Sequence, residues 1–322
     1  MGQLEFREAT LDDATFSADV QTEVFPERPT DPVVERYWWA QPDDTFVSRR
    51  WVVQRDGEDI GVAYFDHPGW ERLEVPHGDI GGEVLPRHRE RATLVGMLAE
   101  IERRLIADGA KRVAVRANED DEVRLSAIAE LGFREDRRGR RWLLDLAENA
   151  ALIAKMSVES RARMRDEAVE IVTLAEVKDP EKYRKLWRMN EEAAQDVPTT
   201  LPIVEESFED TLRWLRSPSM REDRFWIARV GDEIVGASVL GYPPVRGIVG
   251  TEWTATARSV RGRGIARALK CETLMQAIAL GVDRVRTGND GANDPILHIN
   301  ATMGYRQWVS SINFLKDVPA AR

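Results

Sequence analysis

The stretch "ARSVRGRGIARALK", Ala257 to Lys270, combines five basic residues with two glycines and contains no carboxylate. The chain of 322 residues is acidic as a whole, with a formal net charge of −10. Gly262 and Gly264 lack Cβ atoms, so a ligand can approach the backbone closely between the cations. The unpaired N–H groups and the dipole at the start of the following helix favour an anion. The stretch therefore predicts a turn that binds a polyphosphate, with the basic side chains adding local attraction.

Two common phosphate-binding motifs do not fit this stretch. A P-loop requires Gly-Lys-Ser/Thr, which is missing. A dinucleotide fingerprint requires glycine or alanine at its third position, where "GRGIAR" places Arg267. A different polyphosphate ligand is therefore expected.

The chain contains the same pattern twice. At a constant offset of 172 residues, and without a gap, four arginines and glycines recur: Arg89 with Arg261, Arg91 with Arg263, Gly109 with Gly281, and Gly132 with Gly304. A fixed offset over this length indicates a duplicated unit. We predict a first unit at residues 1–150 and a second at 151–322, joined by a charged helix near Asp145 to Ala168.

Each copy shows the same order of elements. A strand and a helix are followed by two apolar runs around Asp-Gly or Gly-Asp, which predict a hairpin. A strand, a turn (the glycine turn in the second copy) and a long helix come next. The two long helices end near Gly109 and Gly281. A short strand and a last helix close each copy. We therefore predict an α/β (α+β) fold of two tandem units, each a mixed central sheet flanked by helices.

Composition excludes several classes of protein. The chain has no run of about eighteen apolar residues, so no membrane span and no membrane partner are expected. An acidic chain does not favour nucleic-acid binding. One cysteine and four histidines make a structural metal site improbable, and no metal is expected. The single cysteine and the lack of an apolar signal core favour a cytoplasmic location.

The pattern Arg-Gly-x-Gly-x-Ala after a strand resembles the acetyl-CoA-binding motif of the GCN5-related N-acetyltransferases (GNAT). The later "TGNDGANDPILHINATMGY" is similar to the next strand and helix of that family. The resemblance covers nearly the whole chain as two tandem copies, a known arrangement in the family. It implies acetyl-CoA as co-substrate, with its diphosphate on the turn and its pantetheine arm between two splayed strands. The implied binding residues are Thr254, Ala255, Thr256, Ala257, Arg261, Gly262, Arg263, Gly264, Ile265, Ala266, Asn289 and Asn293.

The first copy departs from this motif. Glu90 and Ala92 stand where Gly262 and Gly264 stand in the second copy. A glutamate in a diphosphate site repels the ligand, and Asp121 replaces Asn293. We expect the first unit to have lost acetyl-CoA binding and to serve as a scaffold or as a wall of the acceptor site.

Three residues are candidates for the chemistry of acetyl transfer. Strand alternation places Glu252 on the same face as Thr254 and Thr256, and the resemblance implies a general base on this strand. The family's usual acid is a tyrosine four residues before the closing glycine, where this chain has Asn300. Asparagine can hydrogen-bond the thiol or the pantetheine, and water or Tyr305 can replace the missing acid.

The acceptor is expected to contact Trp187, Glu191 and Asp196, because the segment from Trp187 to Pro202 corresponds to the acceptor wall of the family. The acidic side chains would hold an ammonium group, or they form a solvated helix face. The leading hypothesis is an N-acetyltransferase acting on a primary amine of a small molecule in the second unit. The alternatives are a mycothiol-synthase-like acyltransferase and a non-catalytic acyl-CoA-binding or protein-interaction protein. A homodimer is left open.

Overall fold

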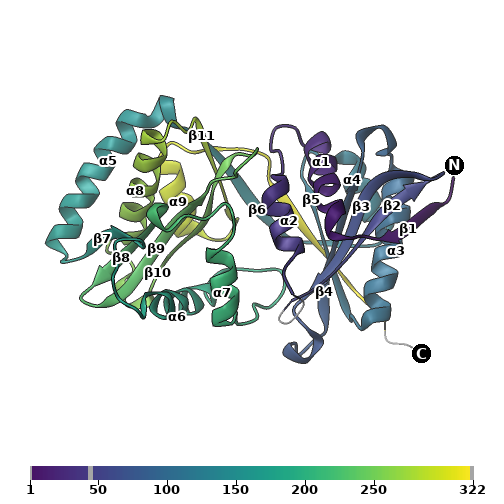
Figure 1. Ribbon diagram of the computed structural model, residues 1–322, viewed down its shortest axis with the longest axis horizontal. Helices are drawn as coiled ribbons and strands as arrows, with labels where there is room; N and C mark the ends of the chain where they lie inside the picture. Colours follow the sequence, from purple (N-terminus) through teal and green to yellow (C-terminus); the bar gives the residue numbers. More distant parts are fainter. Residues whose placement is uncertain (1, 43–45, 320–322) are drawn as a thin grey trace.

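The computed structural model describes residues 2–42 and 46–319. It consists of a first half, up to Asp145, and a second half that begins at Leu146; the two lie side by side along the long axis (Figure 1). The first-half helices are α1 (Ala14–Val24), α2 (Pro32–Trp39), α3 (Arg91–Asp108) and α4 (Glu122–Glu130). The second-half helices are α5 (Leu146–Asp166), α6 (Lys182–Ala194), α7 (Phe208–Leu215), α8 (Ile265–Ala279) and α9 (Asp294–Thr302).

The strands of both halves join into one mixed sheet, in the order β1-β2-β3-β4-β5-β13-β6-β11-β10-β9-β8-β7. The first-half strands are β1 (Leu4–Glu8), β2 (Val47–Arg55), β3 (Glu58–His67), β4 (His77–Val84), β5 (Arg112–Asn118) and β6 (Arg134–Asp145). The remaining strands are β7 (Glu170–Thr173), β8 (Phe225–Val230), β9 (Glu233–Gly241), β10 (Val249–Thr256), β11 (Arg284–Asp290), β12 (Arg306–Gln307) and β13 (Ser311–Asp317). The predicted α/β architecture of two sheet-and-helix units is confirmed.

The hairpin turns have the backbone that the sequence signals require. Asp56 and Gly57 between β2 and β3 both have positive φ, 52° and 80°, as a two-residue turn of type I′ demands. Gly231 has φ 58° between β8 and β9. Both predicted hairpins are therefore present, and the connecting helix expected after Asp145 is α5, whose first turn is capped by the Asp145 carboxylate.

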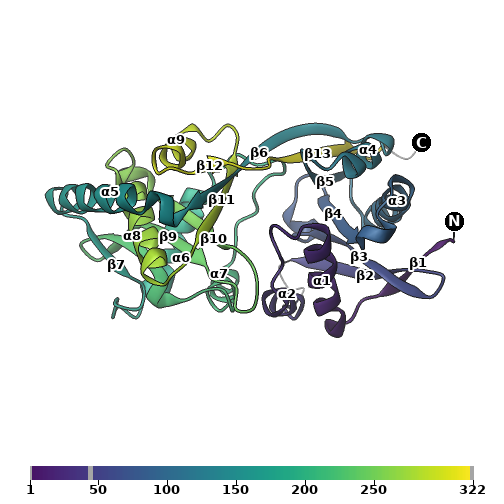
Figure 2. The same cartoon turned by 90° about the horizontal axis from the view of Figure 1, so that it is seen from above.

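The two halves exchange strands at their junction. The last strand of the chain, β13, lies between β5 and β6 and pairs with both, so it completes the sheet of the first half. The end of β6 pairs antiparallel with β11 and so completes the sheet of the second half. Figure 2 shows β6 and β13 running together along one side of the molecule. The boundary expected at residue 150 falls inside α5, and this exchange links the two units across it.

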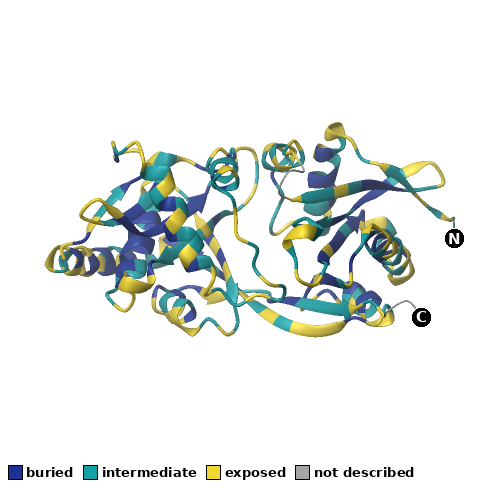
Figure 3. Ribbon diagram, turned by 90° about the horizontal axis from the view of Figure 1, so that it is seen from below, coloured by how far each residue is buried: buried dark blue, intermediate teal, exposed yellow. Residues whose placement is uncertain are grey.

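Each half has its own apolar core between helices and sheet, seen as the dark blue segments of Figure 3. In the first half, α3 packs its buried stripe, which includes Leu94, Leu98 and Ile101, against β2 to β5. In the second half, α8 packs Leu269 and Leu274 against the sheet, while α5 lies alongside it. No helix in the described part of the chain is long and apolar enough to span a membrane.

Candidate functional site

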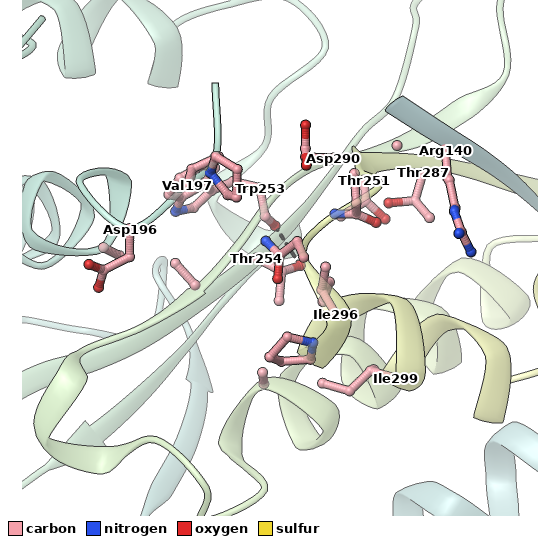
Figure 4. A pocket seen from close by; sticks show the side chains of 18 of the residues that line it. Arg140, Asp196, Val197, Thr251, Trp253, Thr254, Thr287, Asp290, Ile296 and Ile299 are labelled. Atoms are coloured by element: carbon pink, nitrogen blue, oxygen red, sulfur yellow. Dashed lines mark hydrogen bonds between the residues drawn. The ribbon is translucent and has the colours of Figure 1, made fainter. Parts of the chain in front are cut away.

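Two parallel strands of the second half separate and open a cavity. Strands β10 and β11 pair only at Val249–Val285 and Gly250–Arg286. Beyond these pairs the β11-facing edge of β10 is unpaired, and a bulge on its other side leaves Glu252 between Thr251 and Trp253. The cavity between the strands and α8 has a volume of about 1660 Å³. Figure 4 shows Thr254 on the side of Ile296 and Ile299 of α9, whereas Trp253 points the other way, toward Val197, and its Nε1 donates to Asn190 Oδ1 of α6 at 3.0 Å.

The glycine turn lies at one end of this cavity. Gly262 and Gly264 have φ of 78° and 86°, a conformation that other residues adopt only with strain. A Cβ atom at Gly262 would meet nothing within 4 Å, so the backbone there is open to a ligand. The first hydrogen bond of α8 runs from Ala268 N to Gly264 O. In the part of the chain that the structure describes, the N–H groups of residues 262–267 have no acceptor, as a diphosphate site requires.

The arginines of the turn are paired with carboxylates, which corrects the expectation that they supply unbalanced positive charge. Arg258 and Arg261 both bind Asp196, at 2.8 Å and 2.7 Å. Arg263 binds Glu167 and Arg267 binds Glu159. The free N–H groups, rather than excess cationic side chains, are therefore the main anion-binding feature of the turn.

Arg163 of α5 is a cation that the sequence reasoning missed. Its guanidinium donates to Gly262 O at 3.2 Å, lies against Gly264 and lines the cavity. Among the described residues it has no carboxylate within 4 Å. No local sequence pattern indicates this role, because Arg163 reaches the turn only through the packing of α5 on α8.

The structure brings most of the predicted cofactor residues together. The following line the cavity: Thr254, Ala255, Thr256, Arg261, Gly262, Gly264, Ile265, Ala266, Asn289 and Asn293. Two do not. The Ala257 side chain is buried in the core, and Arg263 turns away to Glu167 at 2.7 Å.

Glu252 lies at the bulge, on the side of the sheet away from α8. The bulge breaks the alternation, so the prediction that Glu252 shares a face with Thr254 and Thr256 is wrong. Its side chain covers Gly241, where a Cβ atom would come within 2.8 Å of Glu252 Cγ. Arg286 Nη2 is 3.5 Å from its carboxylate. Protein surrounds the group on most sides, yet 34% of its side-chain surface stays accessible from the cavity. Desolvation raises the Glu252 pKa and Arg286 only partly opposes the rise, which suits a proton acceptor near neutral pH.

Asn300 and Tyr305 lie below the cavity rather than in its lining. Asn300 is fully buried and donates to Asn289 Oδ1 at 2.7 Å, so it holds a residue that does line the cavity. Tyr305 is also buried, and burial raises its pKa far above the ordinary value. A phenol in this state is a poor proton donor, so the suggested substitution of Tyr305 for the missing acid receives no support from its environment.

Lys270 is the second residue that the sequence reasoning missed. It lines the cavity from α8, is 2% exposed, and its Nζ lies 5.2 Å from the centre of the Tyr305 ring. No described carboxylate lies within 4 Å of it, and desolvation lowers its pKa to about 8. A signal was present in the repeat, since the equivalent position of the first copy is Leu98, a core residue.

The predicted acceptor residues are engaged elsewhere. Trp187 Nε1 donates to Glu206 O at 2.9 Å, and Glu191 accepts from Glu206 N at 3.1 Å. These side chains hold the segment after α6 and do not line the cavity. Asp196 lines the cavity but is bound by Arg258 and Arg261, which keep its pKa far below the usual value. The expectation that these three residues hold an ammonium group is therefore revised.

The corresponding turn of the first half is closed. Helix α3 begins at Arg91, directly after Glu90, so no glycine turn precedes it. Arg89 is drawn into ion pairs with Glu83 and Asp121, at 3.0 Å and 2.5 Å. The first helical bond, from Leu94 N to Glu90 O, corresponds to that from Ala268 N to Gly264 O, so the two halves differ in the glycine turn and not in this bond. Among the described residues of the first half, the start of α3 therefore lacks the open glycine backbone that accompanies the free N–H groups of the second half.

Comparisons with known proteins agree with this geometry. Residues 185–304 match the profile of the acetyltransferase (GNAT) family. A tandem GNAT protein from the clavulanic acid biosynthesis pathway aligns over 99% of this chain and 100% of its own, with a TM-score of 0.75 and 16% identity. A GCN5-related N-acetyltransferase from Sphaerobacter thermophilus gives 0.67 and 18% identity over 98% of this chain and 95% of its own. No curated protein matches.

Across residues 2–42 and 46–319, no group of three or more His, Cys, Asp or Glu side chains is placed to hold a metal ion. The family profile covers the separated strands, the glycine turn and α9, and the structural likeness extends the same fold to the first half. Residues 185–304 therefore carry a GNAT acetyltransferase domain, and the chain as a whole has the tandem, two-unit GNAT fold.

Proposed function

We propose that this protein is an N-acetyltransferase that transfers the acetyl group of acetyl-CoA directly to a primary amine of a small molecule, in its second half. The observation that carries the proposal is a single cavity with an open N–H turn at one end and a glutamate of raised pKa at the strand bulge. The first recognises a diphosphate, and the second accepts a proton. The match of residues 185–304 to the GNAT family supports acetyl-CoA as the acyl donor.

The cavity fits acetyl-CoA in three respects. The N–H groups of residues 262–267 would bind the diphosphate. The unpaired edge of β10 from Thr251 to Thr256 offers backbone groups to the amides of the pantetheine arm, as a neighbouring strand would. Asn289, fixed by Asn300, offers a further polar contact. Acetyl-CoA supplies an activated thioester, so the protein needs to orient the amine and to move two protons.

Glu252 would take the proton that the amine loses on attack. Its raised pKa makes the carboxylate a stronger base than a solvated glutamate, while attraction to Arg286 favours the ionised form. Its side chain is partly exposed and lines the cavity, so an amine at that end of the cavity would be able to reach it.

Lys270 would return a proton to the departing sulfur. With a pKa of about 8 it is mostly protonated at pH 7 and gives up its proton more readily than an ordinary lysine. It lines the cavity, whereas Asn300, at the position of the family's usual acid, cannot donate in this sense. The amine proton ends on Glu252, the Lys270 proton ends on the thiol, and bulk solvent restores both groups.

The proposal is tested by thiol release from acetyl-CoA in the presence of a library of primary amines. Release that depends on an amine, and that falls about 100-fold in Glu252→Gln with acetyl-CoA affinity retained, is the expected result. Tight acetyl-CoA binding without thiol release for any amine would instead favour a non-catalytic acyl-CoA-binding protein. That outcome would also leave no role for the raised pKa of Glu252.

A further inference from the structure

A second cavity, of about 400 Å³, lies between the two halves and meets the first at Glu252. Glu252, Arg141, Thr287 and Gly288 line both cavities. We call this second cavity the inter-half chamber. It approaches Glu252 from the face of the sheet opposite α8, so a molecule inside it can reach the end of the acetyl-CoA cleft. Its volume is in the range of small-molecule sites.

The chamber has a wall supplied by the first half. Asp31, the N-cap of α2, accepts hydrogen bonds from the backbone N–H groups of Val245 and Arg246, at 2.6 Å and 3.0 Å. Tyr37 of α2 donates to Arg213 O at 2.6 Å. These bonds join α2 to the β9–β10 loop and to α7. The chamber is therefore a built site rather than a gap between two loosely placed units.

The floor and sides of the chamber leave room for a ligand next to Glu252. Gly241 and Gly288 form part of the floor, where the sheet carries no side chains. Three tryptophans, one each from α2, α7 and the segment before β13, give apolar surfaces: Trp38, Trp214 and Trp308. A short hydrocarbon skeleton would pack against these rings.

Positive charge gathers at one end of the chamber. Arg141 of β6 donates to Asn118 Oδ1 at 2.6 Å, and no described carboxylate lies within 4 Å of it. Desolvation, and then repulsion from Arg28, Arg116 and Arg286, lowers the Arg141 pKa to about 10. Asp120 opposes this change only in part. A half-buried guanidinium among three others is a costly arrangement unless an anion binds to it.

Besides Glu252, the carboxylates that line the chamber are Asp31 and Glu35, and both are already engaged. Asp31 is occupied by four backbone N–H groups, from Val33 and Val34 as well as from the β9–β10 loop. Glu35 accepts from Ser17 and Trp39, and desolvation raises its pKa, which weakens its ionisation. Glu252 is the acidic group of the chamber that remains available to a ligand.

We propose that the acceptor amine also carries an anionic group, a carboxylate or a phosphate, which Arg141 binds while Glu252 takes the amine proton. This inference rests on the proposed acetyl transfer and adds the class of its substrate. The first half then has a function of its own, because α2 and β6 supply the wall and the anion-binding arginine of an acceptor site that the second half completes.

The test uses pairs of amines that differ only by the acidic group. Suitable pairs are L-phenylalanine with phenethylamine, β-alanine with ethylamine, and phosphoethanolamine with ethanolamine. We expect the acidic member of at least one pair to show a kcat/KM at least about tenfold higher, the value of one charge-assisted hydrogen bond. The pair that responds distinguishes a carboxylate from a phosphate.

Arg141→Gln should reduce that ratio to about one. Arg138→Gln is the matched control, since Arg138 lies on the same strand but is exposed and pairs with Glu135. A ratio that persists in Arg141→Gln, or neutral amines that are the better substrates in every pair, would overturn the inference.

A second readout separates this inference from the proposed function. Calorimetric binding of the same pairs to the CoA-loaded protein does not require turnover. Preferential binding of an acidic member, lost in Arg141→Gln, would support the anion subsite even if no thiol were released. Equal binding within each pair, or no binding by any acidic member at millimolar concentration, would contradict it even if other amines were acetylated.

Discussion

The two halves of this protein share one fold, yet the turns before their long helices are built in opposite ways. In the second half, Gly262 and Gly264 hold the backbone open, and the N–H groups of residues 262–267 have no acceptor among the described residues. In the first half, α3 starts two residues earlier in the repeat, so no turn precedes it. Arg89 forms ion pairs with Glu83 and Asp121. Two glycines therefore decide whether the same scaffold presents an anion site.

The largest effect is expected from giving the second turn the character of the first. Gly264→Glu introduces a Cβ at φ 86° and a carboxylate among the free N–H groups. Backbone strain and charge repulsion should together weaken acetyl-CoA binding by more than about 1,000-fold, measured by calorimetry. Ala92→Glu, at the equivalent exposed position of α3, is the matched control and should change the affinity less than about twofold. Equal losses in the two variants would contradict a single site.

Removing the base should separate chemistry from binding. Glu252→Gln is expected to lower kcat about 100-fold with little change in acetyl-CoA affinity. Because the Glu252 pKa is raised, the wild-type rate should fall on acidification at a pH above that of an ordinary glutamate, near 4.3. If the rate of Glu252→Gln fell on acidification at the same pH as that of the wild type, another group would be responsible for the fall.

Lys270→Leu copies the first half at the position of Leu98. We expect kcat to fall about tenfold. The wild-type rate should also decline above about pH 8, as the lysine loses its proton, and this decline should disappear in the variant. The matched control is Leu98→Met, a conservative change in the other core. A basic limb that persists in Lys270→Leu would exclude Lys270 as its source.

The buried Lys270 should also make the stability of the protein depend on pH. Its folded pKa, about 8, lies below the unfolded value of 10.5, so the unfolded chain binds more protons between these values. The free energy of unfolding should therefore rise with pH across that window. Lys270→Leu removes a buried unpaired charge and should raise the melting temperature at pH 7, whereas loss of a structural ion pair would lower it.

The smallest effect is expected at Arg163, which has no counterpart in the first turn. Arg163→Ala should weaken acetyl-CoA binding by about threefold, because the side chain is exposed and its charge is screened. The difference from wild type should shrink as salt is raised. Arg165→Ala, on the same last turn of α5, is the control. A loss of 100-fold would mean that Arg163, rather than the backbone, carries the site.

The sequence predicted those features of the fold that depend on local pattern and repetition. The duplicated order of elements, both hairpin turns and the helix at the junction are present. The exchange of β6 and β13 was not predicted, because "SINFLKD" carries no signal of which distant strand it pairs with. Strand pairing across nearly 200 residues is decided by tertiary packing.

The parts of the candidate site that the backbone forms were predicted from the sequence. The parts that depend on side chains from distant elements were missed. The glycines were identified because their spacing is visible in the sequence. Glu252 was identified from its strand, but the bulge at this residue was not predicted, so its face was predicted wrongly. The arginines were expected to be unpaired, yet Asp196, Glu167 and Glu159 reach them from other elements. Arg141 and the chamber formed by α2 depend on the docking of one half on the other, which no local pattern reveals.

The central claim is that one half binds acetyl-CoA and the other does not. The most direct test is the stoichiometry of acetyl-CoA binding, measured by isothermal titration calorimetry on the full chain. The account predicts one site per chain, which is lost in Gly264→Glu. Two sites, or one site that survives Gly264→Glu, would contradict it.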